Sequence, residues 1–221
     1  MENNSLQHDN YRHKGLRKRL IDSLREKGIK DENVLRAMNQ VPRHLFLDSS
    51  FLEFAYQDKA FPIGSGQTIS QPYTVAYQSE LLRVKPEEKI LEIGTGSGYQ
   101  SCVLLEMGAK VYTIERQKNL FEKTKARLAV IGYKPKMFYG DGYKGLPAFA
   151  PFDKILITAA APEIPQPLLD QVKPGGILVV PVGPPELQVM VTLHKSLDGE
   201  TVRKEHDTFR FVPMLGNKAR D

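Results

Sequence analysis

The sequence is short of cysteine and of long apolar runs, and both shortages restrict what the protein can be. It contains one cysteine, Cys102, so an intramolecular disulfide is impossible and a zinc cluster is not expected. A single thiol fits a reducing cytoplasm, which is the location that we expect. No apolar run approaches the roughly 20 residues that a membrane helix needs. No apolar stretch follows Met1–Ser5, so a secretory signal is not expected either.

An excess of charge of one sign is also absent from most of the chain. The 31 basic and 26 acidic residues leave a net charge of +5, and residues 1–30, with eight basic and four acidic side chains, hold +4 of it. A nucleic-acid enzyme usually spreads a basic surface around its site. We therefore interpret Arg17, Lys18 and Arg19 as a solvated helix face, and we expect neither nucleic acid nor a membrane as a partner. A nucleic-acid patch stays the alternative for this segment.

Length and composition are ordinary for one folded unit. The 221 residues are 41% hydrophobic and 26% charged, which suits one sizeable core and leaves little room for a second complete domain. We expect a single domain over residues 1–221 and a monomer. Within the domain, residues 1–83 read as a helical and loop region, 84–183 as an α/β core, and 184–221 as late strands.

The N-terminal region reads as helical with irregular connections. Leu16, Leu20 and Leu24 recur every four residues, which predicts an amphipathic helix that Gly28 would stop. Asp31 is placed to cap a second helix. Residues 61–72 follow as a loop rich in glycine and polar residues and without a clear period. A loop of this length in a compact domain is often functional.

From residue 85 onward, strands and helices alternate. This pattern predicts a mostly parallel sheet with helices on both faces, the α/β architecture called Rossmann-like. After Gly183 the helices stop, and late strands, expected to be antiparallel, follow. The predicted strands are 89–93, 111–115, 137–139, 154–157, 177–182, 189–193 and a run near 209–212, and the predicted helices are 97–107 and 117–131.

A glycine-rich turn after the first strand of the core carries the chemistry. The segment 92–99 reads Glu-Ile-Gly-Thr-Gly-Ser-Gly-Tyr, and it opens a helix whose free N–H groups can receive a polar ligand. A dinucleotide fingerprint would place its third glycine one residue later, which disfavours NAD and FAD. An acid before G-x-G-x-G is instead the pattern of class I S-adenosylmethionine-dependent methyltransferases. Glu115 ends the next strand, where it can bind ribose hydroxyls, and Asp141-Gly142 ends the third, near an adenine amino group.

The sequence lacks the signature motifs of other classes of methyltransferase. After the fourth strand the chain reads Thr158-Ala159-Ala160, without the Asn/Asp-Pro-Pro-aromatic motif of amino-methylating DNA enzymes. Cys102 lies within a predicted helix, where packing suits it better than nucleophilic attack on a flipped base. The five histidines show no metal-ligand spacing, and we interpret His44 as a structural hydrogen-bonding residue. No metal site is expected.

Residues 56–73 resemble a segment of the protein-L-isoaspartate (D-aspartate) O-methyltransferase family. Its signature is the Gly-x-x-Ile-Ser-Gln-Pro run that ends at Pro72, before the glycine turn. Segments 41–46, 91–99 and 210–214 also look like family segments, in family order, so the resemblance spans nearly the whole chain. It implies the class I methyltransferase fold, with an unusual strand order at the C-terminal edge of the sheet. Leu215-Gly216-Asn217 departs from the family pattern, so no contact is carried over beyond Met214.

The resemblance implies S-adenosyl-L-methionine as the cofactor and isoaspartyl peptides and proteins as partners. Ser70 matches the active-site serine, and the peptide groove matches Ala60, Phe61, Ser70, Val212 and Pro213. The cofactor-binding set comprises Gln67, Thr68, Ile69, Ser70, Glu92, Gly94, Thr95, Gly96, Ser97, Glu115, Asp141 and Gly142.

The chemistry implied by the resemblance needs few catalytic groups. A carboxylate has a pKa of roughly 4, so it is ionised and nucleophilic at neutral pH without a general base. In-line placement of the reactants and exclusion of water are what the reaction requires. Ser70 would then orient the acceptor carboxylate. A methyltransferase for RNA or a small metabolite and a non-catalytic binding module stay as alternative functions.

Overall fold

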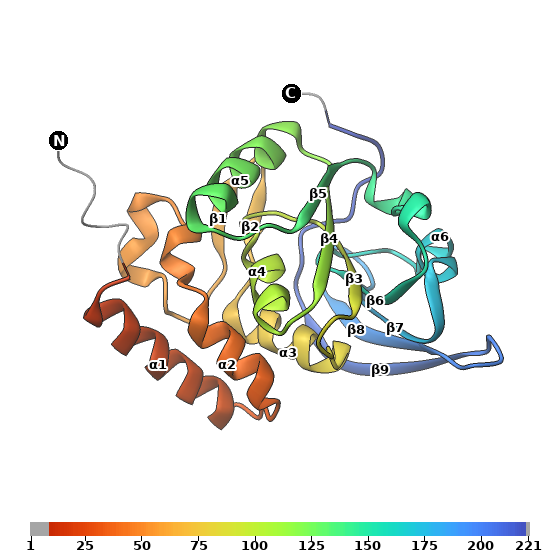
Figure 1. Ribbon diagram of the computed structural model, residues 1–221, viewed down its shortest axis with the longest axis horizontal. Helices are drawn as coiled ribbons and strands as arrows, with labels where there is room; N and C mark the ends of the chain where they lie inside the picture. Colours follow the sequence, from red (N-terminus) through yellow and green to blue (C-terminus); the bar gives the residue numbers. More distant parts are fainter. Residues whose placement is uncertain (1–8, 220–221) are drawn as a thin grey trace.

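A seven-stranded sheet runs through the molecule and separates two unequal layers (Figure 1). The computed structural model describes residues 9–219. In spatial order the strands are β5 (Lys136–Tyr139), β4 (Lys110–Glu115), β3 (Lys89–Ile93), β6 (Phe152–Ile157), β7 (Val172–Val182), β8 (Gln188–Lys195) and β9 (Thr201–Phe209). The first five strands are parallel to one another, whereas β8 and β9 add to the edge as antiparallel strands. The predicted mostly parallel α/β sheet is confirmed.

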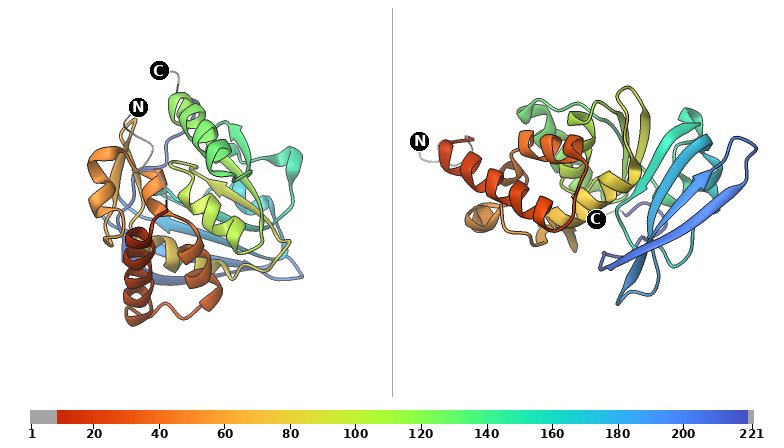
Figure 2. Two further views of the ribbon diagram at one scale, coloured as in Figure 1. Left: turned by 60° about the vertical axis from the view of Figure 1, so that its left-hand side comes forward. Right: turned by 90° about the horizontal axis from the view of Figure 1, so that it is seen from below.

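One face of the sheet carries the long helices and the other is covered thinly (Figure 2). Helices α3 (Pro72–Leu82), α4 (Tyr99–Glu106) and α5 (Lys118–Ile131) pack their apolar side chains into the larger core. The second face is covered by α6 (Gln166–Asp170) and the short 3-10 turns η3 (Gly142–Lys144) and η4 (Pro147–Phe149). Helices on both faces are therefore present. No helix within residues 9–219 is both long and apolar enough to cross a membrane.

The last strand differs from its prediction. The apolar run at 209–212 predicts a strand, yet β9 occupies Thr201–Phe209 and ends where that run begins. Strand β9 is the edge strand of the sheet, and eight of its nine residues are polar or largely solvent-exposed, so it has no apolar alternation. Beyond it, the chain folds back over the sheet, and the amide of Ala160 donates to the carbonyl of Val212 at 2.8 Å.

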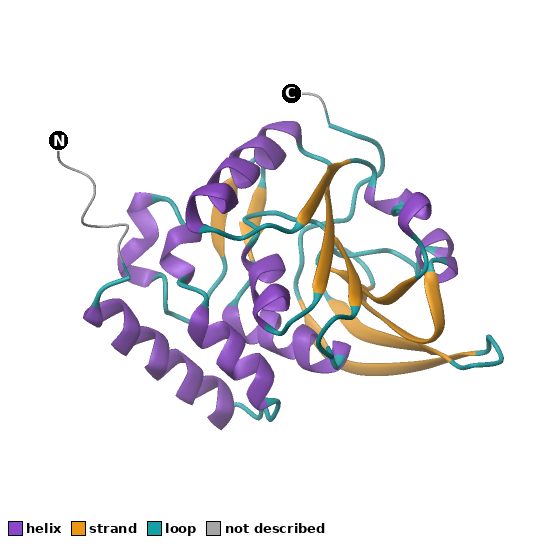
Figure 3. Ribbon diagram, in the orientation of Figure 1, coloured by secondary structure: helices purple, strands orange, loops and turns teal. Residues whose placement is uncertain are grey.

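Residues 61–69 are ordered more regularly than the predicted loop. They form a two-stranded antiparallel hairpin, β1 (Phe61–Gly64) and β2 (Gln67–Ile69), with Phe61 opposite Ile69 (Figure 3). Strands of four and three residues are too short to show a period of two, and a glycine-rich turn separates them. Ser70 follows the hairpin directly and precedes α3. The hairpin thus sets the position of the segment that resembles the family signature.

Helix α1 (Tyr11–Glu26) shows the predicted apolar stripe, but its charged face is not uniformly solvated. Leu20 and Leu24 are buried, as predicted. Arg17 is buried too, which corrects the interpretation of that residue as part of a solvated face. Its position is three residues before Leu20, on the same helix face, and its guanidinium donates to both carboxylate oxygens of Asp9 and to the hydroxyl of Tyr56. Lys18 and Arg19 are exposed.

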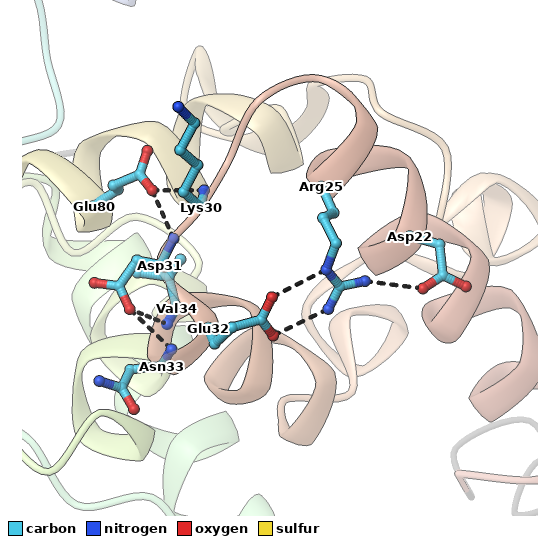
Figure 4. A network of polar contacts seen from close by, with 8 residues as sticks. All are labelled: Asp22, Arg25, Lys30, Asp31, Glu32, Asn33, Val34 and Glu80. Atoms are coloured by element: carbon cyan, nitrogen blue, oxygen red, sulfur yellow. Dashed lines mark hydrogen bonds and ion pairs between the residues drawn. The ribbon is translucent and has the colours of Figure 1, made fainter.

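Helix α2 (Glu32–Gln40) begins at the predicted cap (Figure 4). The Asp31 side chain accepts from the amide of Asn33 at 2.8 Å and from that of Val34 at 3.4 Å. Glu80 on α3 accepts from the amides of Lys30 and Asp31, both at 2.7 Å, so the same turn is tied to the next helix. The 3-10 turns η1 (Arg43–Phe46) and η2 (Ser49–Phe54) then lead to the hairpin.

The substitution Asp31→Ala should lower the free energy of unfolding by about 1 kcal/mol, because two amides at the start of α2 lose their acceptor. Chemical denaturation measures this change. Asp22→Ala is the matched control: Asp22 is exposed and forms an ion pair with Arg25, so its removal should change stability by less than about 0.5 kcal/mol. Equal effects of the two substitutions would contradict the capping role.

Candidate active site

The carboxyl ends of the parallel strands form one edge of the sheet, and the predicted cofactor motifs meet there. The turn after β3, the last residue of β4, the turn after β5 and the turn after β6 all contribute to one cavity. This is the edge at which open α/β sheets bind ligands. The cavity is lined by Gln67, Thr68, Ile93, Gly94, Gly96, Ile114, Glu115, Arg116, Gly142, Thr158, Ala159, Val212, Pro213, Met214 and Leu215.

The glycine turn owes its shape to one backbone conformation and one close neighbour. Gly94 has a φ of +97°, and its amide donates to the carbonyl of Ile114 at 2.9 Å. A Cβ at position 94 would lie 2.7 Å from the hydroxyl oxygen of Thr158, so only glycine fits. The Thr158 hydroxyl lies 2.9 Å from the carbonyl oxygen of Ile93 and 2.8 Å from that of Gly94. Sequence reasoning gave Thr158 no role, because the contact spans 64 residues.

Glu115 holds the turn from the neighbouring strand. Its carboxylate accepts from the amide of Gly96 at 2.9 Å and from that of Gln117 at 2.8 Å. The side chain is buried and faces the cavity. Burial raises the pKa of Glu115 above its ordinary value, although the hydrogen bonds from Gln117 and Gly96 oppose this shift. Glu115 therefore ends β4 and lines the cavity, and its contact with a ribose stays a prediction.

Glu92 at the end of β3 and Thr95 and Ser97 within the turn are buried, and none of them lines this cavity. Glu92 has no exposed surface, and its carboxylate is hydrogen-bonded by the hydroxyl of Ser101. Burial raises the pKa of Glu92 to about 7. The hydroxyls of Thr95 and Thr113 are 2.7 Å apart and link the turn to β4. The side chains of these three predicted cofactor residues therefore make contacts within the protein, and their contact with a cofactor stays a prediction.

Gly142 lines the cavity, whereas Asp141 lies just outside it. A Cβ at position 142 would come 2.5 Å from Cγ2 of Ile93, so the backbone approaches β3 closely. The Asp141 carboxylate accepts from the amide of Tyr143 at 3.0 Å and from that of Asn217 at 3.0 Å. Asp141 therefore ties down the C-terminal segment that departs from the family pattern. Within that segment Leu215 contributes to the cavity wall.

A second cavity adjoins the first and contains Ser70. It has a volume of about 510 Å³, and Ala60, Ser70 and Val212 are among its lining residues. Thr68, Thr158 and Val212 line both cavities and so mark their junction. Of the other residues predicted at this site, Pro213 lines only the first cavity, while Phe61 and Ile69 are buried in the core beside it.

Arg43 supports the segment around Ser70 from inside the protein. Its guanidinium has no exposed surface and donates to the carbonyl of Ser70 at 2.9 Å and to that of Lys59 at 3.2 Å. It lies 4.9 Å from the ring centre of Tyr99, a cation–π contact. Burial lowers the pKa of Arg43 to about 10, so the side chain stays charged at neutral pH. Arg43 belongs to segment 41–46, whose physical role the sequence did not reveal.

Asp58 fixes the same segment from its other side. Its carboxylate accepts from the amide of Tyr73 at 2.8 Å and from the side chain of Gln71 at 3.0 Å, and it forms an ion pair with Lys27. Burial opposes the charge, yet these hydrogen bonds hold the pKa of Asp58 below its ordinary value. Ser70 thus stands between two ordered anchors at the start of α3.

Few ionisable side chains line the two cavities: Glu115 and Arg116 line the first, and Tyr73, Asp207 and Arg210 line the second. No histidine, lysine or cysteine of residues 9–219 lines either one. Cys102 is fully buried, and burial raises the pKa of its thiol, which confirms that it is a packing residue. The site suits a reaction in which the acceptor is already ionised.

Comparisons with known proteins agree with this geometry. The model of the protein-L-isoaspartate (D-aspartate) O-methyltransferase (PCMT) family matches residues 15–219. The chain belongs to this family. A protein-L-isoaspartate O-methyltransferase of Cytophaga hutchinsonii is 61% identical over 208 residues, which are 94% of each chain. One from Christiangramia forsetii is 57% identical, over 95% of this chain and 99% of its own.

Solved structures of this family share the fold. A protein-L-isoaspartate O-methyltransferase superposes with a TM-score of 0.82 and 29% identity, over 91% of this chain and 67% of its own. A Plasmodium falciparum protein assigned to PCMT, crystallised with S-adenosyl-L-homocysteine, gives a TM-score of 0.80 at 25% identity, over 91% of this chain and 99% of its own. These likenesses confirm the class I methyltransferase fold expected from the resemblance.

A cluster of possible metal ligands lies away from this PCMT site. Asp9, His13 and His44 each offer a ligand atom within 4.8 Å of the others, which the spacing of the histidines along the chain did not suggest. Both oxygens of Asp9 are bound by Arg17, and the rings of His13 and His44 are stacked with centres 3.8 Å apart. Nδ1 of His44 lies 2.7 Å from the hydroxyl of Tyr56, which confirms the expected structural role of His44.

Glu92 should make the free energy of unfolding decrease as the pH rises, which is the opposite of the usual effect of a carboxylate. Its folded pKa, about 7, exceeds the ordinary value of 4.5, so between these values the folded state binds more protons than the unfolded state. Its contribution to stability is therefore largest below pH 4.5 and decreases as the pH rises to 7. Glu92→Gln should remove this decrease, so the variant should gain about 3 kcal/mol relative to the wild type over that range.

Urea unfolding of both proteins at several pH values between 4.5 and 7.5 measures the difference. Glu106→Gln, on the same helix as Ser101, serves as the control and should run parallel to the wild type. A constant difference between Glu92→Gln and the wild type across this range would contradict the shifted pKa.

Proposed function

We propose that the protein transfers a methyl group from S-adenosyl-L-methionine to the free α-carboxylate of L-isoaspartyl residues in damaged peptides and proteins. The observation that carries the proposal is the junction of the two cavities. One contains the glycine turn and Glu115, the other contains Ser70, and they meet at Thr68, Thr158 and Val212. A methyl donor in the first cavity and a carboxylate in the second would meet at this junction. D-Aspartyl residues, which the family description also names, are a second acceptor.

The residues of the first cavity fit the cofactor. When bound, S-adenosyl-L-methionine supplies a methyl group on a positively charged sulfur. Gly94 and Gly96 allow close approach of its methionine part, and Glu115 accepts hydrogen bonds from the ribose hydroxyls. Gly142 lies at the adenine end. Asp141 can reach the adenine amino group with the lone pairs that its bonds to Tyr143 and Asn217 leave over.

The second cavity positions the acceptor. The acceptor carboxylate is ionised at neutral pH, so no residue of the site would have to remove a proton before it accepts the methyl group. The Ser70 hydroxyl donates a hydrogen bond to the carboxylate. Arg43 and Asp58 hold the backbone around Ser70, and Arg43 adds a buried positive charge behind it. Orientation and exclusion of water then supply the rate enhancement.

The backbone on both sides of Ser70 selects the peptide. Ala60 and Val212 line the cavity with Ser70, Pro213 lines the adjoining cavity, and Phe61 is buried beside Ala60. A groove of main-chain groups at these positions would accept many sequences. The isoaspartyl linkage places the carboxylate directly on Cα. A normal aspartate holds it one bond further out, away from Ser70. We further propose that the protein acts as a monomer, and the single buried cysteine supports a cytoplasmic location.

A matched peptide pair tests the function. The isoaspartyl peptide should be methylated at least about 100-fold faster than the same peptide with normal aspartate, because a displacement of about 1 Å costs about that much in rate. Transfer of labelled methyl groups measures both rates. Equal rates, or methylation of an RNA or a metabolite but of neither peptide, would falsify the proposal.

Glu115→Ala should weaken S-adenosyl-L-methionine binding by about 1.5–3 kcal/mol, because charge-assisted hydrogen bonds to the ribose are lost. Isothermal titration calorimetry measures the dissociation constant. The exposed Glu122 on α5 provides the control Glu122→Ala, which should bind like the wild type. An unchanged dissociation constant in folded Glu115→Ala would reject the ribose contact.

Ser70→Ala should leave cofactor affinity nearly unchanged and lower kcat by about 10- to 1000-fold, because one orienting hydrogen bond is removed. The control is Ser50→Ala on η2, because Ser50 is exposed and lines neither cavity. Full activity would show that the Ser70 hydroxyl does not orient the acceptor, and loss of cofactor binding would show a structural role.

A further inference from the structure

The cavity that contains Ser70 is much larger than a carboxylate requires, and three aromatic side chains line it beside polar and charged ones. Its volume of about 510 Å³ lies within the range of sites for complete small ligands. Tyr73, Phe209 and Phe211 line it together with Ser70. We refer to these three side chains as the aromatic wall. Tyr73 comes from the first turn of α3, Phe209 from the end of β9, and Phe211 from the segment that follows.

The rings of the wall are arranged as a continuous row. The ring centres of Tyr73 and Phe209 are 6.3 Å apart with planes 21° from parallel, and those of Phe209 and Phe211 are 6.4 Å apart. Tyr77 supports the row from behind, 5.0 Å from Phe209 and 5.8 Å from Tyr73. All four side chains are half-buried. A row of this kind presents flat apolar surface to whatever enters the cavity.

The wall has a fixed position relative to the acceptor site. The Tyr73 amide is held by Asp58, and the Ser70 carbonyl is held by Arg43, so both ends of this short segment are anchored. Burial and the nearby charge of Asp207 raise the pKa of Tyr73, which keeps its hydroxyl neutral. If these rings only completed the hydrophobic core, they would not line the same cavity as Ser70.

We infer that the aromatic wall binds a large apolar side chain, best an aromatic one, of a residue that flanks the isoaspartyl residue in the substrate. The inference rests on the proposed function and adds a sequence preference to it. The occupant follows from continuity: a peptide whose carboxylate reaches Ser70 must continue through the same cavity. Aromatic side chains pack favourably on such a wall in offset or edge-to-face geometry.

Four isoaspartyl peptides test the preference. They carry phenylalanine or alanine immediately before or immediately after the isoaspartyl residue and are otherwise identical, with capped ends. The wild-type protein should show a kcat/KM about 10-fold or more higher for phenylalanine than for alanine on one of the two sides. In Phe209→Ala and in Tyr73→Ala this ratio should fall below about 3. Phe54→Ala is the control, because Phe54 is exposed on η2 and lines neither of the two cavities.

A binding measurement complements the rates. The protein contains no tryptophan, so a tryptophan placed at the flanking position is the only one in the mixture. Its emission should shift to shorter wavelength on binding to the wild type and shift less with Phe209→Ala. If Phe209→Ala unfolds, Phe209→Leu serves as a milder variant. Its ratio of kcat/KM for the phenylalanine peptide to that for the alanine peptide should lie between the wild-type ratio and about 3.

The outcomes separate the two proposals. Equal rates for all four peptides in the wild type would overturn the aromatic wall and leave the function intact. A phenylalanine preference that persists undiminished in the two alanine variants and in Phe209→Leu would also overturn it. Failure of the wild type to methylate any isoaspartyl peptide would overturn the function, and the wall with it.

Discussion

Parallel alignment of the first five strands is the constraint on which the site depends. Because β3, β4, β5 and β6 run in one direction, their carboxyl ends meet at one edge, and motifs far apart in the chain come within hydrogen-bonding distance. Thr158 reaches Gly94 across 64 residues, and Glu115 reaches the Gly96 amide across 19. A shift of one residue in any register would turn these side chains to the opposite face.

A second constraint joins the N-terminal region to this edge. Arg43 and Asp58 are polar groups with little or no access to water, and both direct their hydrogen bonds to the segment from Lys59 to Tyr73. Buried charges of this kind are costly unless their partners are in place. The packing of α1, α2 and the 3-10 turns therefore keeps the proposed acceptor site in position, although these elements supply few of its lining residues.

Sequence reasoning succeeded where one pattern had one structural meaning. Short apolar runs ended by glycine or an acid became the core strands, and Asp31 became a helix cap. It failed where local pattern and environment differed. Strand β9 is polar because it is an edge strand, and the hairpin strands are too short to alternate. Arg17 was interpreted as solvated from its charge, but it lies on the buried face of α1, where Asp9 and Tyr56 satisfy it.

The residues of the candidate site differ in the same way: some lie in local sequence motifs, and others depend on contacts between distant segments. Gly94, Gly96, Glu115, Ser70 and Val212 could be predicted, because the motifs that carry them are contiguous and the resemblance to the family assigns them an order. Thr158, Arg43, Tyr73 and Phe209 could not, because each acts through a partner distant in sequence. The sequence by itself determined the fold class, the family and the residues of the glycine turn. Only the tertiary structure decided which buried groups hold that turn and what lines the space beyond Ser70, since long-range packing leaves no local pattern.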